Sequence, residues 1–595
     1  MNAKNAITTP SWVSKSWHWL VSLALLAGWM GTAPAPARAA SLVAVVNSAI
    51  DDFSAHDTSP GDGVCLDTLA RGCTLRAAIE EANALAGADT ITFSTAMSIV
   101  LDTGVGGLNP LTEQVTIDAS GVWDTANNQP GVILDGNGGN FNGLALGANG
   151  SNIYGLYITN FNGSAIYIYS SGNTIGGTAL GQRNVLSGNG YEGVRISGSS
   201  AQSNVVQNNY IGTNPGGNVA NPNGDGVLIT NGAANNTIGG STTTVGNVIS
   251  GNSYYGVRIE TSGSDGNGLG GNVIGAAVDG NTALGNGSDG VRVDNGPANT
   301  YIGGGGALEG NIIAHNTGPG IYILNASATN IERNTIGNNA TFGILLQGGW
   351  NSFIGGNTIT ANLGDGIKII GSAATGNWIM QNNIYSNTLK GIELFNGGNG
   401  ELAAPAIASA TSGGATGTGC ANCYIEIFSD SSDEGQTYHG AVNADGSGNW
   451  TYIGALTGPH VTATATDASL NTSEFSAPYT IGGANQPPNI PACPNPIDTD
   501  TQVFLTPTLA WCGGDPDGDS VTYTVMGGVQ GLPQWSQWCN TTATSCAPGA
   551  LQPNTTYEWQ VTANDGVNPA VNGPVWTFTT GAGNGYKIFL PLVRK

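Results

Sequence analysis

The middle of the chain alternates apolar and polar residues in short runs that return at near-regular intervals. One recurring frame is Gly-(Val/Ile)-x-(Ile/Leu/Val), which begins at Gly193, Gly226, Gly256, Gly290, Gly320, Gly343, Gly366 and Gly391. A second is Asn-x-(Ile/Leu)-x-x-Asn, which begins at Asn184, Asn209, Asn247, Asn311, Asn334, Asn357 and Asn382, with a degenerate copy at Asn272 that ends in Ala277. Alternation with period two, in runs too short for a helix, predicts β-strands.

The spacing of these frames predicts a solenoid. Successive asparagine frames begin 23 to 39 residues apart, and repeats of this length bury their apolar faces against one another. Three short strands per repeat, with Gly and Asn at the corners, are typical of a parallel β-helix. The stretch resembles the right-handed parallel β-helix repeats of the pectate-lyase-like superfamily. We therefore expect an all-β protein with a right-handed parallel β-helix over residues 101–400, in which the asparagines stack as hydrogen-bonded ladders.

Residues 41–100 hold one helical pattern. It runs from Cys73 to Asn83, with Thr74 as its N-cap and an apolar face made by Leu75, Ala78, Ile79 and Ala82. The segment 64–93 resembles the CSLREA domain of secreted bacterial β-helix proteins, whose Arg-Glu-Ala-Ile stands here as Arg-Ala-Ala-Ile from Arg76. We expect this amphipathic helix to cover the open first rung of the solenoid.

Two further domains are expected after the β-helix. Residues 401–482 carry short alternating strands and resemble bacterial Ig-like repeats, and residues 483–580 resemble a fibronectin type III module, so both predict β-sandwiches. The tail 581–595 is apolar with a basic end, which suits either a sorting signal or a final edge strand. Near the start of the last domain, Asp515, Asp517 and Asp519 offer oxygen ligands to calcium, although a hairpin turn explains the same residues.

Net charge and a targeting segment indicate the cellular location and exclude one class of ligand. A net charge of −24 argues against nucleic-acid binding, because phosphate neutralisation needs Lys and Arg. It suits an extracellular protein that takes up calcium or meets a cationic surface. Residues 1–40 read as a secretory signal: Lys4 and Lys15 precede an apolar core at 19–30 and a small-x-small site at 37–39. We expect a secreted or cell-surface protein with no integral membrane segment after cleavage.

The eight cysteines lie in close pairs. In an exported chain, such pairs predict local disulfides that hold loops together. A metal site is disfavoured because His is scarce and no two Cys-x-x-Cys units face each other. The expected pairs are Cys65–Cys73, Cys420–Cys423, Cys493–Cys512 and Cys539–Cys546.

Candidate chemistry lies on the outward face of the Gly-Val-x-Ile strands. The x position of the frame faces water and the residue before each Gly forms a second outward column. Opposite charges share a rung at Glu192/Arg195, Asp289/Arg292 and Asp365/Lys368. The candidate catalytic residues are Glu192, Asp225, Arg258, Asp289, Arg292, Asp365 and Lys368.

Three interpretations of these columns stay open. A β-eliminating polysaccharide lyase needs a base and a cation, calcium among the options, to stabilise the charge beside a uronate. A glycosidase needs two carboxylates at a set separation, and Glu192 and Asp225 are one rung apart, ~5 Å. The structural interpretation is that the charges form solvated ion pairs worth about 0–1 kcal/mol.

Insertions mark where a ligand would meet the coil. The two longest repeats carry extra residues at two corners, 213–224 with 276–288 and 240–246 with 303–310, and 177–183 matches the second corner. Stacked insertions build walls, and a groove between walls is where a solenoid binds. Tyr210, Tyr255, Tyr322 and Trp350 offer aromatic faces to sugar rings in this part of the chain. The sequence thus favours a protein that binds a polysaccharide or another surface ligand, with a lyase or glycosidase as the alternative.

Overall fold

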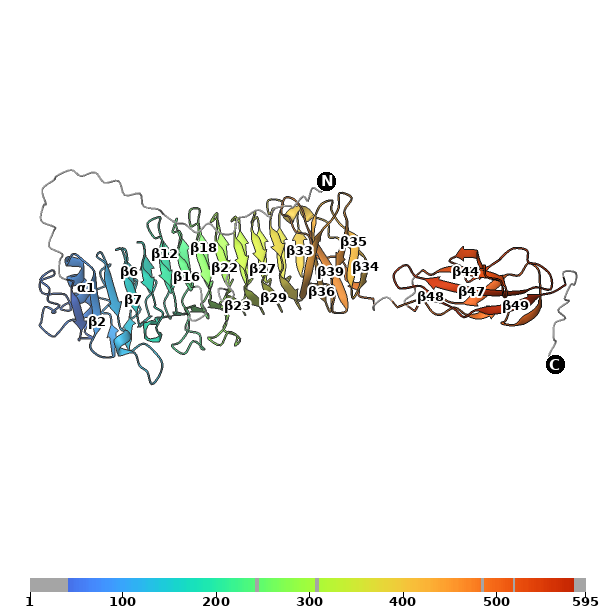
Figure 1. Ribbon diagram of the computed structural model, residues 1–595. Coiled ribbons are helices and arrows are strands. Elements are labelled where there is room, and N and C mark those ends of the chain that lie inside the picture. The colour runs from blue at the N-terminus through green and yellow to red at the C-terminus, as the bar shows by residue number, and fades with distance from the viewer. Residues whose placement is uncertain (1–40, 241–244, 305–309, 483–485, 517–519, 583–595) are drawn as a thin grey trace, which may run out of the picture. The chain divides into compact units, whose positions relative to one another are not determined.

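The computed structural model describes residues 41–240, 245–304, 310–482, 486–516 and 520–582. The expected signal segment 1–40 and most of the tail 581–595 lie outside these residues. A parallel β-helix of three long sheets dominates the described part of the chain (Figure 1). Within the described residues, no helix combines the length and the apolar character that a membrane crossing requires.

The first sheet has 12 strands, and each pairs in parallel with a strand from the next coil. Its strands are β1 (Val43–Val46), β2 (Asp89–Phe93), β4 (Val115–Asp118), β7 (Asn152–Tyr154), β10 (Thr174–Ile175), β13 (Val205–Val206), β16 (Thr237–Gly239), β19 (Gly268–Gly270), β22 (Tyr301–Gly303), β25 (Asn330–Glu332), β28 (Phe353–Gly355) and β31 (Trp378–Met380).

The second sheet has 11 strands. They are β3 (Met97–Val100), β5 (Val132–Asp135), β8 (Leu156–Thr159), β11 (Val185–Leu186), β14 (Tyr210–Ile211), β17 (Val248–Ile249), β20 (Val273–Ile274), β23 (Ile312–Ala314), β26 (Thr335–Gly337), β29 (Thr358–Thr360) and β32 (Asn383–Tyr385).

The third sheet has 10 strands and is built from the Gly-Val-x-Ile frames. They are β6 (Leu144–Leu146), β9 (Ile166–Ile168), β12 (Val194–Ser197), β15 (Val227–Thr230), β18 (Val257–Glu260), β21 (Val291–Asp294), β24 (Ile321–Leu324), β27 (Ile344–Gln347), β30 (Ile367–Ile370) and β33 (Ile392–Phe395). Three short 3-10 helices lie at corners: η1 (Ser120–Val122), η2 (Leu180–Gln182) and η3 (Gly398–Glu401).

The interior combines stacked aliphatic side chains with two long asparagine ladders. The first ladder runs through the asparagines that open each frame, from Asn184 to Asn382, and each Nδ2 donates to the next Oδ1 at 2.9 to 3.0 Å. The second runs from Asn189 to Asn387 at 2.9 to 3.1 Å. The predicted ladders are confirmed, and they satisfy polar groups that the corners would otherwise bury unpaired.

The two long coils continue the second ladder, and their extra residues form loops outside the coil. In them the second ladder passes through Asn223 and Asn286, so Asn214 and Ala277, which end the sequence frames, are not ladder residues. The additional residues therefore leave the coil between the second and third sheets and return before the ladder position. Stacking is preserved because each coil presents an amide at the same place.

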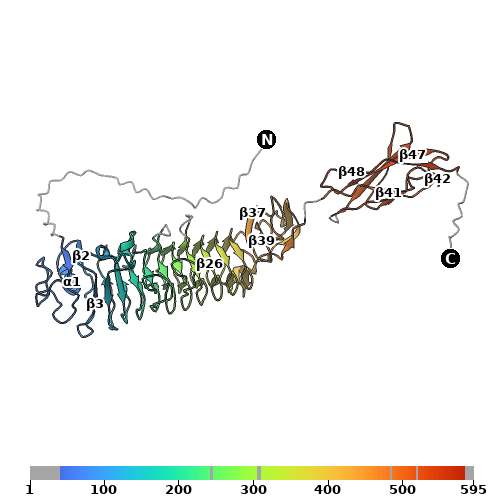
Figure 2. The same cartoon turned by 90° about the horizontal axis from the view of Figure 1, so that it is seen from below.

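The N-terminal segment contributes both strands and a helix to the coil. β1 and β2 begin the first sheet, so the β-helix starts within residues 41–100. Helix α1 (Leu75–Ala84) begins at Thr74, whose hydroxyl accepts a hydrogen bond from Ala77 N, as predicted. Leu75, Ala78, Ile79 and Ala82 join the apolar core of the coil, and Figures 1 and 2 place α1 beside β2.

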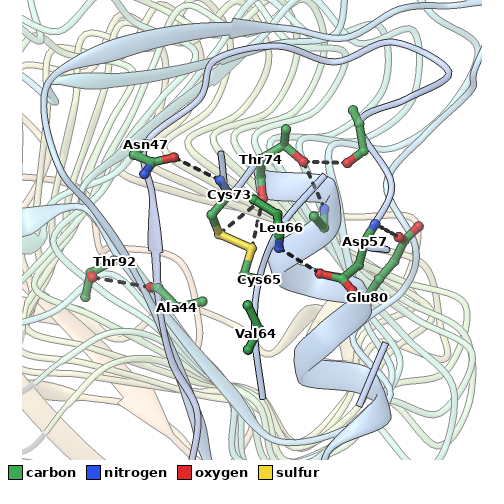
Figure 3. Close-up of a disulfide and its surroundings, with 12 residues drawn as sticks. Ala44, Asn47, Asp57, Val64, Cys65, Leu66, Cys73, Thr74, Glu80 and Thr92 are labelled. Atoms are coloured by element: carbon green, nitrogen blue, oxygen red, sulfur yellow. Dashed lines mark hydrogen bonds between the residues drawn. A yellow bond between two sulfur atoms is a disulfide. The ribbon is translucent and has the colours of Figure 1, made fainter. Parts of the chain in front are cut away.

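The loop before α1 is held by a disulfide and by buried charges. Cys65 and Cys73 are bonded (Figure 3). Arg76 pairs with Asp51 at 2.8 Å, both side chains being buried, and it donates to the carbonyl oxygens of Gly106 and Gly107. Arg76 is therefore a packing and hydrogen-bonding residue.

Residues 401–482 form a first antiparallel module with its own apolar core. One sheet contains β34 (Ala406–Thr411), β35 (Gly414–Thr418) and β38 (Asn449–Ile453); the other contains β36 (Tyr424–Asp430), β37 (Thr437–Asn443), β39 (His460–Thr466) and β40 (Tyr479–Thr480).

This first module supplies hydrogen-bond acceptors to the last coil. Asn387, the last residue of the second ladder, donates from N and Nδ2 to the two oxygens of Glu434. Gln381 N donates to Glu426, and Ile379 N donates to the Thr472 hydroxyl. The carboxylate of Glu434 thus occupies the place that the next asparagine oxygen holds elsewhere in the ladder.

The last described part, 486–582, is a second antiparallel module with a core of Trp, Tyr and Val side chains. One sheet contains β41 (Ala492–Asn495), β43 (Leu509–Cys512) and β46 (Ser545–Cys546); the other contains β42 (Asp500–Val503), β44 (Thr522–Val529), β45 (Ser536–Thr541), β47 (Thr556–Asn564), β48 (Val571–Asn572) and β49 (Trp576–Thr580). The cysteine pairs Cys420–Cys423, Cys493–Cys512 and Cys539–Cys546 are bonded in the two modules.

Candidate functional site

The charged candidates gather on the outer face of the third sheet. The strand register places Arg258 beside Arg292 and Arg292 beside Tyr322 on successive strands β18, β21 and β24. Valine and isoleucine between them point into the core and are fully buried. The alternation of each strand thus directs the polar side chains outward together.

We call the residues around these two arginines the central cluster: Tyr255, Arg258, Glu260, Asp289, Arg292, Asp294 and Tyr322. Arg258 pairs with Glu260 at 2.6 Å and with Asp294 at 3.4 Å. Arg292 pairs with Asp289 at 3.1 Å and with Asp294 at 2.7 Å. Asp294 therefore joins the two arginines, and the cluster holds two cations against three carboxylates.

Aromatic rings enclose the arginines of the central cluster. The Arg292 guanidinium lies 4.6 Å from the Tyr322 ring centroid and 5.5 Å from that of Tyr255. Arg258 lies 5.3 Å from the Tyr255 centroid. The Tyr322 hydroxyl donates to Gln347 Oε1 at 2.5 Å. Such stacking holds guanidinium groups in fixed orientation, so this face is preorganised before any ligand arrives.

Burial and charge set the ionisation of the cluster. Burial lowers the pKa of Arg292, but hydrogen bonds to Asp294 and Asp289 outweigh it and raise that pKa above its usual value. Burial raises the pKa of Asp289, against the lowering effect of Arg292. Burial also raises the pKa of Tyr322. Arg292 is thus a permanently charged donor, and Tyr322 stays protonated at neutral pH.

Asp225 lies one rung from the cluster in a different electrostatic setting. It accepts a hydrogen bond from Tyr255 N at 3.2 Å. Burial, with a contribution from the charge of Glu192, raises the pKa of Asp225 to about 6. Glu192 is itself buried and accepts a hydrogen bond from the Ser164 hydroxyl at 2.5 Å. Asp225 therefore changes its charge near neutral pH, as a general acid or base must.

A second group, the C-terminal cluster, comprises Asp365, Lys368, Lys390, Glu393 and Glu474. Lys368 contacts Glu393 and pairs with Asp365 at 3.3 Å. Lys390 pairs with Glu474 of the first antiparallel module at 3.0 Å. All three predicted in-rung ion pairs form, since Arg195 also meets Glu192 at 3.9 Å.

The predicted aromatic residues separate into different environments. Tyr255 and Tyr322 belong to the central cluster. Trp350 is exposed in the corner between β27 and β28. Tyr210 is only 7% exposed; it packs with Val185 and Val248 under the Arg183 guanidinium, 4.1 Å from its ring centroid. Tyr210 thus belongs to a small apolar cluster on the outside of the second sheet.

Two of the predicted insertions, 213–224 and 276–288, lie at the corner between the second and third sheets. Val278 N donates to Gly217 O, so these two insertions bind each other. A β-carbon at Gly217 would lie 2.9 Å from the Tyr210 ring, and one at Gly280 would lie 2.9 Å from Ile312 Cδ1. These loops therefore lie across the outer face of the second sheet, because it carries apolar side chains that need cover.

Glu260, Asp294 and Glu474 are not among the residues predicted from the sequence. The first two occupy the residue after the Gly-Val-x-Ile frame, which also faces outward, so extending the frame by one position would have found them. Glu474 comes from another module and has no sequence signal. Asp515 is described, but Asp517 and Asp519 lie outside the described residues. Among the described residues, no three His, Cys, Asp or Glu side chains are grouped to hold a metal.

Comparisons with known proteins agree with the β-helix. A family described as "Right handed beta helix region" matches residues 269–426. A comparison with curated proteins gives no match. Among solved structures, the A-module of Azotobacter vinelandii mannuronan C-5 epimerase AlgE4 is 17% identical, with 52% of this chain and 82% of that chain covered and a TM-score of 0.38.

Two further structures are similar at the same level. The A-module of Azotobacter vinelandii mannuronan C-5 epimerase AlgE6 is 16% identical, with 57% of this chain and 97% of that chain covered and a TM-score of 0.36. A variant of the periplasmic alginate epimerase AlgG is 14% identical, with 52% and 71% covered and a TM-score of 0.27.

Proposed function

We propose that the outer face of the third sheet binds a carbohydrate chain through the central cluster. The observation that carries the proposal is the pair Arg258 and Arg292, held side by side by Asp294 and enclosed by the rings of Tyr255 and Tyr322. Fixed donors, carboxylate acceptors and flat aromatic surfaces suit the hydroxyl groups and apolar faces of sugars. Two cations against three carboxylates favour a neutral chain over a strongly acidic one, because an anionic ligand would meet net negative charge.

The cellular location and the domain organisation that we propose rest on the sequence. We propose a secreted or cell-surface protein in which residues 41–100 act as a CSLREA-like cap and residues 401–482 and 483–580 are Ig-like and fibronectin type III-like sandwiches. In that arrangement the β-helix presents its binding face and the modules act as spacers. Calcium binding at Asp515, Asp517 and Asp519 belongs to the same proposal.

Binding is tested with the mature full chain against neutral and acidic polysaccharides by affinity gel electrophoresis. Arg292→Ala and Tyr322→Ala should each weaken binding at least about tenfold, as loss of a central aromatic or arginine contact does in other interfaces. Arg195→Ala is the matched control, because Arg195 also lies on the third sheet and stacks on a tyrosine, Tyr167. Unchanged binding by Arg292→Ala and Tyr322→Ala would refute the proposed site.

A second candidate function, a polysaccharide lyase or glycosidase, is favoured by Asp225. A buried carboxyl with a pKa of about 6, beside the arginines of the central cluster, has the properties of a general acid or base. Product formation on the same polysaccharides, with and without calcium, tests it. Turnover that Asp225→Asn abolishes would establish the enzyme; binding without turnover by the wild-type protein would leave the binding function alone.

A further inference from the structure

The first sheet carries a column of aromatic residues on its outer face. Three of four successive strands, β22, β25, β28 and β31, place an aromatic ring at the same register position, and the fourth places Asn330 there. Tyr301 and Phe353 are two rungs apart, ~10 Å at the usual strand spacing, and Trp378 follows one rung later. The column therefore runs along the axis of the solenoid.

Two of these rings form a continuous surface. The ring centroids of Phe353 and Trp378 are 5.2 Å apart. A β-carbon at Gly355 would lie 2.5 Å from Phe353 Cζ. The tip of the Phe353 ring therefore lies over the Gly355 backbone. Replacing Gly355 by any other residue would displace the ring.

Two further aromatic residues are exposed to solvent: Tyr301, at the first rung of the column, and Trp350, three residues before Phe353. Tyr301 is 47% exposed and Trp350, in the corner before β28, is 39% exposed. Packing within the coil explains the contact between Phe353 and Trp378, but it does not explain why Tyr301 and Trp350 expose large aromatic surfaces to water. Exposed aromatic surface of this kind marks an interaction site.

We propose that Tyr301, Trp350, Phe353 and Trp378, the aromatic strip, bind an extended polysaccharide chain at a site separate from the central cluster. The flat rings offer stacking surfaces for sugar rings, and the half-buried side chain of Asn330 lies between Tyr301 and Phe353 as a hydrogen-bonding group. A linear polymer matches a linear column. A protein partner would need about 800 Å² of surface on each side, which a strip one residue wide on each strand does not offer.

The experiment uses the mature full chain and barley β-glucan, xylan, galactomannan and polygalacturonate as probes in affinity gel electrophoresis. The double variant Tyr301→Ala/Trp350→Ala should weaken binding to at least one of them by about tenfold or more. These residues are chosen because they are the exposed members of the strip, so their loss disturbs the coil least. Tyr479→Ala, an exposed tyrosine in the first antiparallel module, is the matched control.

A second measurement does not depend on mutation. Saturating polysaccharide should protect Trp350 and Trp378 from oxidation by N-bromosuccinimide, with the modified residues identified by mass spectrometry. The proposal is overturned if the double variant binds every probe as the wild type does, or if Trp350 is oxidised equally with and without a bound probe.

The two carbohydrate proposals fail separately. Binding that is lost in Arg292→Ala and kept in Tyr301→Ala/Trp350→Ala supports the central cluster and overturns the aromatic strip. The reverse result supports the aromatic strip and overturns the central cluster. Binding to none of the four probes counts against both sites, and capture of a protein alone would replace the aromatic strip proposal with a protein interface.

Discussion

The central and C-terminal clusters look alike along the chain but lie in different surroundings. Each repeats a carboxylate three residues before a cation, Asp289 with Arg292 and Asp365 with Lys368. In the central cluster every ion pair lies within the β-helix, and Asp294 pairs with both Arg258 and Arg292. The C-terminal cluster is extended by Lys390, which pairs with Glu474 of the first antiparallel module.

The same outward column therefore lies within the coil at one place and at the junction with the first antiparallel module at another. At the junction the coil ends, so its last backbone N–H groups have no further strand of the coil to accept their hydrogen bonds. Carboxylates and hydroxyls of the first module take over as acceptors, among them Glu426, Glu434 and Thr472. In the middle of the coil, neighbouring strands already satisfy the backbone, so the side chains there remain available for recognition.

The largest expected effect comes from removing the acceptor that ends the second asparagine ladder. Glu434→Ala removes the acceptors of Asn387 N and one acceptor of its Nδ2, which keeps its hydrogen bond to Ile359 O at 3.1 Å. Loss of both Glu434 oxygens, which leaves the half-buried Asn387 N unpaired, should cost about 1–3 kcal/mol of unfolding free energy, measured by urea denaturation at pH 6. Asp433→Ala, the exposed neighbouring acid, is the control. A loss below about 0.5 kcal/mol would show that the junction does not stabilise the coil.

The same junction should respond to pH. Burial raises the pKa of both Glu426 and Glu434 from 4.5 to about 7. The folded state therefore holds these protons more tightly than the unfolded state, so their stabilising contribution is full below pH 4.5 and is lost as pH rises through 7. Shifts of this size correspond to roughly 1–3 kcal/mol, measured as unfolding free energy from pH 5 to pH 8.

The variant Glu426→Gln/Glu434→Gln identifies the source of that pH dependence. It should flatten most of the slope between pH 5 and pH 8, because neither amide titrates. A residual slope of the same sign belongs to Asp225, whose pKa is also raised. An unchanged slope in the double variant would contradict the assignment.

A smaller effect on stability is expected at the central cluster. Arg292→Met removes the cation that pairs with Asp289 and Asp294, both of which are buried. Arg258 still pairs with Asp294 in this variant. The unfolding free energy should therefore fall by only about 1–2 kcal/mol, measured by thermal or urea unfolding. Arg195→Met is the matched change at a weaker pair. Equal losses of unfolding free energy in Arg292→Met and Arg195→Met would show that the ion pairs of the central cluster stabilise the coil no more than the Arg195–Glu192 pair does.

The smallest effect is expected for Lys390→Met. The side chain is 53% exposed, and ion pairs that solvent reaches contribute about 0–1 kcal/mol. The unfolding free energy should therefore change by less than about 1 kcal/mol and should lose part of its salt dependence. A larger loss would mean that the Lys390–Glu474 pair, rather than the buried acceptors, joins the first module to the coil.

Much of the candidate site follows from strand alternation alone. Once Gly-Val-x-Ile is read as a strand, Arg258, Arg292 and Tyr322 must share one outer face, and their in-rung partners must lie close to them. Asp294 and Glu260 lie in the next outward position and follow from the same rule. The ion pair that joins adjacent rungs through Asp294 does not, because it depends on side-chain conformations that only the stacked coil imposes.

The sequence by itself determined the parallel β-helix, the asparagine ladders and the pairing of the cysteines, because each depends on short-range patterns that repeat. Only the tertiary structure decided that Asn223 and Asn286, rather than Asn214 and Ala277, continue the second ladder in the long coils. It also decided that the loops 213–224 and 276–288 cover the second sheet, and that Glu434 ends a ladder begun at Asn189. These contacts join residues far apart in the chain, and local alternation carries no information about which distant acceptor meets a buried donor.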